Sequence, residues 1–262
     1  MTEVLGPKHQ RIIELRRLIG RRSSRSGEVL LEGPRTIGEA LDAGVVPLTV
    51  IIPESDVDTP ESVALTGRLD AGVEVLTVRD HVFAKLAPSV TPQPMLALVP
   101  RPEFELPARA QPGEVVLVLI DVSDPGNVGT LIRSADAVAA TAVVVAGGAD
   151  PWGSKAVRAS AGSVLRVPVV SAIEPLAALQ MLSKRGFRVV GTSVDEGESH
   201  DGGVLASPVA IVLGSESRGL DSSIESLVDA WATINMPGRT ESLNVAMAGT
   251  LLLYEARRAS TP

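Results

Sequence analysis

Short apolar runs alternate with amphipathic stretches through most of the chain. In the second half, continuous apolar runs at residues 115–120, 142–146 and 209–213 predict fully buried strands. The remaining elements expected there are strands at 164–170, 187–193 and 232–235 and helices near 129–139, 154–161, 174–184, 222–228 and 245–258. Buried strands between helices are typical of a parallel sheet covered on both faces, so this half is predicted to have an α/β fold.

The first part of the chain shows a similar alternation on a smaller scale. Residues 8–20 have apolar side chains on one side and arginines on the other, which predicts an amphipathic helix. The other elements expected there are strands at 29–32, 48–52, 73–78 and 95–99 and a first helical stretch at 36–43. This half is therefore predicted to be a small α/β unit.

Prolines mark the junction between the two halves. Four of them fall within residues 100–113, among polar and charged neighbours. Proline stiffens the backbone and cannot join a central strand, so this stretch is predicted to be a linker. We therefore expect one domain over residues 1–99 and a second over residues 114–262.

Composition and charge narrow the range of possible functions. The chain has 262 residues, no cysteine and a formal net charge of −7, which excludes thiolate chemistry and argues against a general nucleic-acid coat. Residues 1–36 nevertheless hold eight lysines and arginines against four glutamates, and this local positive charge suits phosphate binding. The alternative is an N-terminal helix whose basic side chains are simply solvated. Neither a signal region nor an apolar run of about 18 residues occurs, so we expect a cytoplasmic protein without a membrane partner.

Three segments contain glycine and polar residues, and each follows an apolar run. They are residues 124–133, 211–220 and 236–247. Ligands of open parallel sheets bind beyond the carboxyl ends of strands, so we expect these segments to converge at one edge. No Gly-x-Gly-x-x-Gly, P-loop or Gly-x-Ser-x-Gly motif occurs, which argues against a dinucleotide site, a P-loop site and a hydrolase nucleophile elbow.

The last of these segments leads into a helix. Its apolar residues recur at helical spacing and are expected to pack on a core as one stripe, formed by Leu243, Met247, Leu251 and Tyr254. Ser242 and Asn244 stand where the helix opens, among backbone N–H groups without intrahelical partners. The alternative to a binding role here is that Thr240 or Ser242 simply caps the helix.

Together, the three segments resemble the signature motifs of the SpoU (TrmH-like) branch of the SPOUT methyltransferases. Residues 127–133, 214–220 and 241–245 occur in the family's order and with its internal spacing. The resemblance covers about residues 114–258 and implies that the C-terminal segment passes through an earlier loop to form a deep trefoil knot. It also implies a homodimer that transfers a methyl group from S-adenosylmethionine to a ribose 2′-hydroxyl of RNA.

The first half resembles this family's substrate-binding extension, a small domain related to ribosomal proteins that hold structured RNA. The matching landmarks are Arg21, Arg22, residues 31–35 and residues 91–94. The resemblance favours 23S ribosomal RNA as the substrate. The alternatives are transfer RNA and a non-catalytic RNA-binding or ribosome-assembly protein of the same fold.

The family pattern places the cofactor among three loops, held largely by backbone groups. The residues that the resemblance assigns to it are Thr192, Ser193, Leu213, Gly214, Ile234, Met236, Ser242 and Leu243. Glycine permits close approach of the backbone to a ligand, and the apolar members offer a wall for adenine. Taken singly, each apolar member is more often an ordinary core residue.

A ribose hydroxyl is a poor nucleophile at neutral pH, so it must be oriented and must lose its proton. The resemblance assigns this activation to Arg133, which we expect to position and polarise the hydroxyl because arginine normally stays a cation. Asn127 is expected to orient Arg133 or bind RNA, Glu216 to order its loop, and Ser242 and Asn244 to lie near the acceptor. No metal is required because the sulfonium is already an activated donor.

The side chains expected to contact RNA are Arg21, Arg22, Arg25, Arg35, Lys155 and Arg158, with Ser160 beside them. The alternative for residues 154–162 is an exposed basic helix face. The acidic loop at residues 195–201 has hard-metal ligand types but no recognised metal spacing, so we expect a solvated loop.

Overall fold

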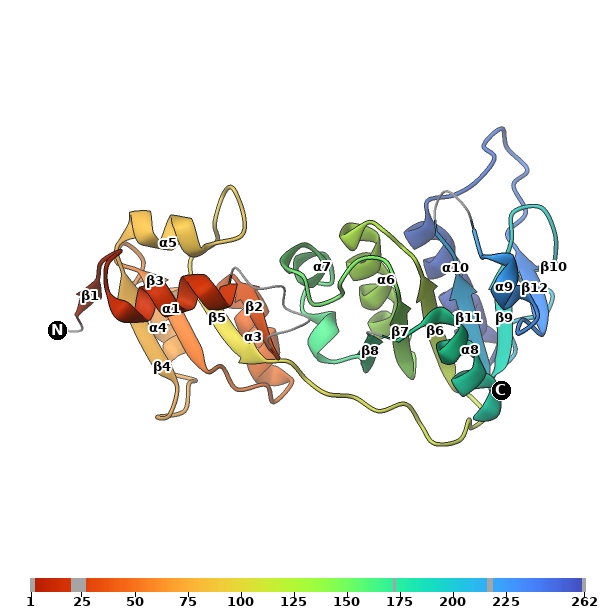
Figure 1. Ribbon diagram of the computed structural model, residues 1–262, viewed down its shortest axis with the longest axis horizontal. Helices are drawn as coiled ribbons and strands as arrows, with labels where there is room; N and C mark the ends of the chain where they lie inside the picture. The colour runs from red at the N-terminus through yellow and green to blue at the C-terminus, as the bar shows by residue number, and fades with distance from the viewer. Residues whose placement is uncertain (1–2, 20–26, 172, 216–218, 261–262) are drawn as a thin grey trace. The chain divides into compact units, whose positions relative to one another are not determined.

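The structure is a computed structural model, and it describes residues 3–19, 27–171, 173–215 and 219–260. The chain divides into two compact units (Figure 1). The first consists of Met1–Pro102 and Trp152–Leu165, and the second of Glu103–Pro151 and Arg166–Pro262. The segment Trp152–Leu165 therefore groups with the first unit, although it lies within the second half of the sequence. Each unit is described separately below.

The first unit is a small sheet with helices on both faces, and the small α/β unit predicted from its sequence is confirmed. Its elements are β1 (Val4–Leu5), α1 (Gln10–Ile19), β2 (Glu28–Glu32), α3 (Pro34–Asp42), β3 (Thr49–Pro53), α4 (Pro60–Thr66), β4 (Glu74–Val78), α5 (Asp80–Leu86), β5 (Leu96–Pro100) and α7 (Ser154–Ala159), followed by a 3-10 turn at Ser163–Leu165. The strand order is β1-β4-β3-β5-β2, and β5 runs antiparallel to both of its neighbours.

The apolar side of α1 closes one face of this sheet. Ile12 and Leu15 are buried in one cluster with Phe83 of α5 and Ile51 of β3. Successive strand residues point to opposite faces, so Val50 and Ile52, which flank Ile51 and are also buried, face the side covered by α3 and α4. The amphipathic helix predicted from residues 8–20 is confirmed.

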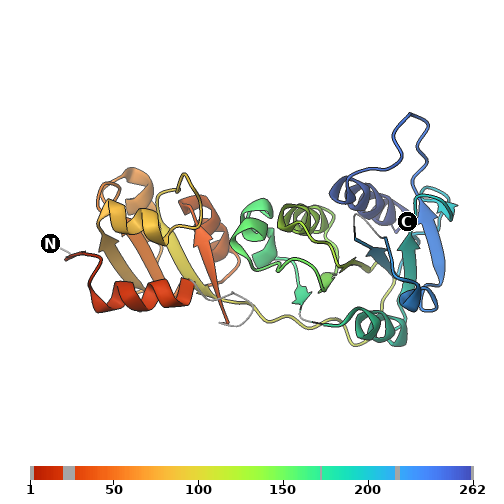
Figure 2. The same ribbon diagram turned by 45° about the horizontal axis from the view of Figure 1, so that its top comes forward.

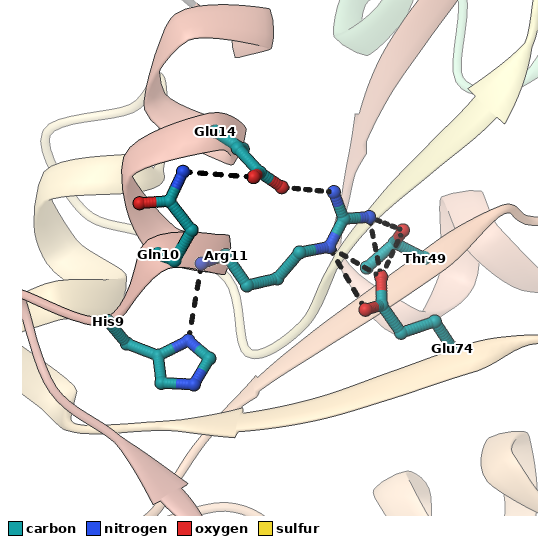
Figure 3. Close-up of polar contacts among 6 residues, drawn as sticks. All are labelled: His9, Gln10, Arg11, Glu14, Thr49 and Glu74. Atoms are coloured by element: carbon teal, nitrogen blue, oxygen red, sulfur yellow. Dashed lines mark hydrogen bonds and ion pairs between the residues drawn. The ribbon is translucent and has the colours of Figure 1, made fainter.

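Arg11, at the edge of the buried side of α1, ties this helix to the strands (Figure 3). Its Nη2 atom lies 2.6 Å from Oε2 of Glu74 on β4, and Nη2 also donates to Oγ1 of Thr49 on β3 at 3.1 Å. The Thr49 hydroxyl in turn donates to the same Glu74 oxygen at 2.9 Å. The hydrogen bond from Arg11, followed by that from Thr49, holds the pKa of Glu74 below its ordinary value despite the opposing effect of burial.

The second unit is a seven-stranded sheet. Its elements are β6 (Val115–Ile120), α6 (Pro125–Ala137), β7 (Ala142–Ala146), β8 (Val169–Ser171), α8 (Pro175–Lys184), β9 (Arg188–Thr192), β10 (Glu198–Ser199), β11 (Val209–Leu213), α9 (Ser222–Glu225), β12 (Ala230–Thr233) and α10 (Val245–Ala259). The strand order is β10-β12-β9-β11-β6-β7-β8, and every pairing is parallel. The predicted parallel sheet with helices on both faces is confirmed.

Helices cover both faces of this sheet, with α6 and α10 on one side of the strands and α8 on the other (Figure 2). The α10 helix lies very close to its neighbours because a Cβ atom at Gly249 would come within 2.4 Å of Leu131 on α6 and 2.5 Å of Leu213 on β11. A larger residue at position 249 would have to displace these two leucine side chains, so glycine lets the last helix pack closely against the middle of the sheet.

The prediction that the apolar stripe of α10 packs on the core is wrong, because the opposite side of the helix is buried. Met247, Leu251 and Tyr254 are 63%, 46% and 55% exposed. The buried face is formed instead by Ala246, Gly249, Leu252, Leu253 and Ala256. Ala246, Gly249 and Ala256 on that face allow the close approach to α6, while Met247, Leu251 and Tyr254 remain on the outside.

Other differences from the sequence predictions are local. The strand expected at 164–170 is divided into the 3-10 turn and the short β8, and the loop expected at 195–201 contains β10. Part of the proline-rich stretch is held in place, because Arg185 donates from Nη1 to the carbonyl oxygens of Leu106 and Pro107. None of the helices in the described ranges is long and apolar enough to span a membrane.

We predict that Glu74→Gln lowers the free energy of unfolding by up to about 1 kcal/mol at neutral pH, because both partners of the ion pair are about one-third exposed. The pKa of Glu74 is depressed in the folded state, so its stabilisation is present above the unfolded pKa and is lost as pH falls through the folded value. The difference from wild type should therefore shrink below about pH 4.

Urea denaturation of the full chain at several pH values, followed by circular dichroism, measures this effect. Glu54→Gln is the matched control, because Glu54 is an exposed carboxylate in the same unit. A Glu74→Gln deficit that is independent of pH would contradict the assignment.

Candidate functional site

A cavity of about 700 Å³ lies where β9, β11 and β12 of the second unit end. Three segments that follow these strands form its walls, together with the first turns of α10. The structure brings to this one cavity all eight residues that the family pattern assigned to the cofactor: Thr192, Ser193, Leu213, Gly214, Ile234, Met236, Ser242 and Leu243. Their convergence follows from the parallel strand directions, which place all three carboxyl ends at the same edge.

Gly214 forms the tightest part of the wall. A Cβ atom there would lie 2.3 Å from the backbone carbon and oxygen of Gly219. Ser215 and Gly219 exchange backbone hydrogen bonds of 3.1 and 2.9 Å, which fold this loop back on itself. Gly214 is therefore packed directly against Gly219, and both residues line the cavity.

The loop after β9 is fixed by hydroxyl groups. Thr192 donates from Oγ1 to the carbonyl oxygen of Val212 at 3.0 Å, which joins the ends of β9 and β11. Ser193 Oγ accepts hydrogen bonds from the backbone N–H groups of Asp195 and Glu196 at 3.2 and 3.3 Å. Both predicted cofactor residues therefore also maintain the shape of the wall.

Asn244 joins the cavity to two helices. Its Oδ1 atom accepts from the backbone N–H groups of Ala246 and Met247 and so caps α10. Its Nδ2 atom donates to Oδ1 of Asn127, in the first turn of α6, at 3.2 Å. The alternative in which Thr240 or Ser242 caps the helix is wrong, since Thr240 bonds instead to the carbonyl oxygen of Ser242.

Arg133 does not belong to the described wall of the cavity. Its side chain is exposed and has no hydrogen bond or ion pair with any residue that the structure describes. Six residues separate it from Asn127, about one and two-thirds turns of α6, so the two side chains leave the helix in different directions. Asn127 accepts a hydrogen bond from Asn244, and Glu216 lies outside the described residues.

The basic residues of the first unit differ in their exposure and in their ion pairs. Arg35 and Lys155 are exposed, whereas Arg158 forms an ion pair of 3.5 Å with the buried carboxylate of Glu32. Glu32 also accepts hydrogen bonds from the Ser89 hydroxyl and from the backbone of Gln93. Arg21, Arg22 and Arg25 lie outside the described residues.

Ser160 is not available to an external partner. It is fully buried, and its hydroxyl donates to the carbonyl oxygen of Val157 at 2.8 Å. The expectation that Ser160 contacts RNA is therefore wrong, because its hydroxyl instead forms a hydrogen bond at the end of α7.

Acidic residues are the part of the cavity that the sequence predictions missed. Asp195 and Glu196, expected in a solvated loop, line the cavity, as does Glu225 at the end of α9. This loop follows the carboxyl end of a parallel strand, and that position alone would have predicted that the loop lines the site. Within the described ranges, no group of three or more acidic or histidine side chains could hold a metal ion.

The model of the SpoU rRNA Methylase family matches residues 114–254, which is just over half of the chain. The chain belongs to this family. A second model, the MRM3-like substrate binding domain, matches residues 9–97. The resemblance inferred from the three motifs and from the first half is confirmed, and with it the enzyme class, a methyltransferase of the SpoU family.

Individual relatives align over nearly the whole SpoU-family chain. The 23S rRNA (guanosine(2553)-2′-O)-methyltransferase RlmP of Bacillus subtilis is 28% identical over 260 residues, covering 98% of this chain and 100% of its own. A 23S rRNA (uridine(2479)-2′-O)-methyltransferase of Streptomyces viridochromogenes is 30% identical, covering 97% and 94%. The crystal structure of AviRb from that organism, in complex with the cofactor AdoMet, matches with a TM-score of 0.85 at 28% identity, covering 96% and 98%.

We predict that Gly214→Ala destabilises the second unit by about 1–3 kcal/mol, because the new methyl group would overlap the backbone of Gly219. Gly238→Ala is the matched control in a neighbouring loop, since a Cβ atom there meets nothing within 4 Å. Thermal unfolding of both variants measures the difference. Equal melting temperatures would show that the Gly214 loop is looser than its geometry indicates.

Proposed function

We propose that this SpoU-family enzyme transfers a methyl group from S-adenosylmethionine to a ribose 2′-hydroxyl of 23S ribosomal RNA. The observation that carries the proposal is the single cavity that collects all eight residues expected to hold the cofactor. A relative of the same fold, AviRb, is known in complex with AdoMet. Two relatives that align with nearly the whole chain are named as 23S rRNA 2′-O-methyltransferases, which favours ribosomal RNA over transfer RNA.

The walls of the cavity suit this cofactor. Its volume falls within the range of about 300–1,000 Å³ that small-molecule sites occupy. Ile234, Met236 and Leu243 supply apolar surface for the adenine, and Leu213 and Gly214, also in the wall, would offer backbone groups to the polar parts of the ligand. When bound, the cofactor supplies a methyl group on a positively charged sulfur, so no metal is needed to activate it.

The acceptor hydroxyl is the group that Arg133 must reach. RNA lies outside the cofactor cavity, so an exposed arginine on α6 is suited to hold the acceptor ribose or its phosphate. Asn127 links α6 to Asn244 in the cavity wall and would keep the acceptor side and the donor side in register. Ser242, also in that wall, would contact the acceptor, and we assign to Glu216 the role of ordering its own loop.

We assign RNA binding to the first unit. Arg35 and Lys155 offer exposed cations, and the pair with Glu32 holds the half-exposed guanidinium of Arg158 in one place. We add Arg21, Arg22 and Arg25 from the sequence pattern. In this assignment residues 1–99 form the substrate-binding domain, residues 100–113 the linker and residues 114–262 the methyltransferase domain, which acts on RNA in the cytoplasm.

A homodimer is the quaternary structure that we propose. Met247, Leu251 and Tyr254 present large apolar surfaces on the outside of α10, and a soluble chain rarely leaves such a face uncovered. A second copy of α10 matches it, because two-fold dimers bring identical patches together. We further propose that the C-terminal segment passes through an earlier loop of the chain to form a deep trefoil knot, as the family resemblance implies.

We predict that Arg133→Ala lowers kcat at least about 100-fold, because the acceptor hydroxyl loses the cation that positions and polarises it. The dissociation constant for S-adenosylmethionine should stay unchanged, since Arg133 is not part of the described cavity wall. Tritium transfer from labelled cofactor into 23S rRNA and into transfer RNA, with calorimetry for cofactor binding, measures both quantities and the choice of acceptor.

Arg109→Ala is the control for this experiment, because it removes an exposed arginine elsewhere in the same unit. Full activity of the Arg133→Ala enzyme would remove Arg133 from the mechanism. Cofactor binding by the wild type without transfer to any RNA would favour the non-catalytic alternative.

We predict that Met247→Glu combined with Tyr254→Glu converts the dimer into a monomer, because two charges on each copy would be buried without partners. Size-exclusion chromatography with light scattering gives the mass directly. Val90→Glu changes a fully exposed apolar residue outside α10 and should leave the dimer intact. A monomeric wild type would refute the homodimer.

A further inference from the structure

The charged residues that line the cavity share one sign. Among the described wall residues they are Asp195 and Glu196, in the loop after β9, and Glu225, the last residue of α9. These three carboxylates are called the acidic wall below. None of them forms an ion pair with a cation in the part of the chain that the structure describes. Among the residues that the structure describes, the acidic wall therefore places negative charge around a cavity whose other lining side chains are neutral.

The backbone that carries the acidic wall is fixed by specific contacts. Ser193 Oγ binds the N–H groups of both Asp195 and Glu196, and Gly197 follows with a φ of +120°. A Cβ atom at Gly197 would lie 2.7 Å from the carbonyl oxygen of Trp231 on β12, so this turn requires glycine. Glu225 sits on α9, whose first turn is capped by Asp221 through a 2.8 Å bond to the N–H group of Ser223.

We propose that the acidic wall selects the charged methyl donor over its spent form, S-adenosylhomocysteine. This inference rests on the proposed function and assigns specificity to residues outside the family-derived set of cofactor contacts. The donor and the spent form differ only by the methyl group and by the positive charge on sulfur. Their amino-acid ends carry the same ammonium and carboxylate, so the effect of the acidic wall on those groups cancels when the two ligands are compared.

The reaction removes this attraction. In methyl transfer the C–S bond breaks with its electron pair remaining on sulfur, and the new C–O bond forms at the ribose. The hydroxyl proton leaves to solvent, so the cavity is left with a neutral thioether. The acidic wall consequently binds the reactant more strongly than the product, which limits inhibition by the product and favours its exchange for a new donor molecule.

The expected size of the effect follows from exposure. All three carboxylates are exposed, and interactions between exposed charges are worth roughly a factor of two to five each. Salt screens such interactions, because the Debye length falls from about 30 Å at 0.01 M to about 3 Å at 1 M. The preference of the wild-type protein for the donor over the spent form should therefore fall as the ionic strength is raised over this range.

The decisive experiment is calorimetry with three ligands: S-adenosylmethionine, S-adenosylhomocysteine and sinefungin, in which an amine replaces the sulfonium. In the Asp195→Asn/Glu196→Gln/Glu225→Gln protein, the affinity for S-adenosylmethionine and for sinefungin should each fall about tenfold relative to the affinity for S-adenosylhomocysteine. Glu198→Gln is the matched control, because Glu198 is exposed on β10 in the same loop but does not line the cavity.

Equal weakening of all three ligands, or no change in any of them, would overturn the inference. Should the triple variant fail to fold, Glu225→Gln alone and the salt series on the wild-type protein test the same charge dependence. Failure of the wild type to bind any of the three ligands would refute the proposed function itself. That outcome differs from tight binding without preference for charge, which refutes only the role of the acidic wall.

Discussion

The side chain of Asn244 connects the parts on which the site depends. One end of its amide caps α10, the other donates to Asn127 on α6, and the residue itself lines the cavity. An amide can do all of this because it carries a donor and an acceptor on the same planar group. Since α10 closes the sheet beside β11 and carries the end of the wall, the position of this helix decides whether the cavity exists. The hydrogen bond between the two asparagines thus couples segments more than a hundred positions apart in the sequence.

Much of this arrangement could be predicted from the sequence because parallel strands obey a strong geometric rule. The apolar runs at 115–120 and 209–213 locate β6 and β11, and polar segments after such strands must meet at one edge. This rule predicts the edge of the sheet at which a site forms, but it does not predict which side chains line that site. It brought Gly214 and Leu243 to one cavity, but it could not tell that Arg133, on the helix after β6, lies outside the described wall. The same rule applied to residues 195 and 196, where the abundance of acidic side chains indicated a solvated loop instead.

Other differences between the predicted and the observed structure arose because the spacing of apolar residues does not show which other element covers them. Met247, Leu251 and Tyr254 share one side of α10, yet the core takes the opposite side, where Gly249 lets the helix approach Leu131. The grouping of Trp152–Leu165 with the first unit was equally hidden, since it depends on contacts such as that between Arg158 and the buried Glu32. Long-range contacts of this kind leave no periodic trace in the sequence.

The order of the cavity segments has a consequence for biosynthesis. Every described wall residue lies between positions 192 and 252, so nothing that the ribosome makes earlier contains any of the pocket. A nascent chain can complete the first unit and most strands of the second while still lacking the residues that close the site. Domains generally fold in the order of their synthesis. The newly made enzyme therefore becomes able to bind its small ligand only after α10 has emerged, and ligand binding cannot assist folding before that point.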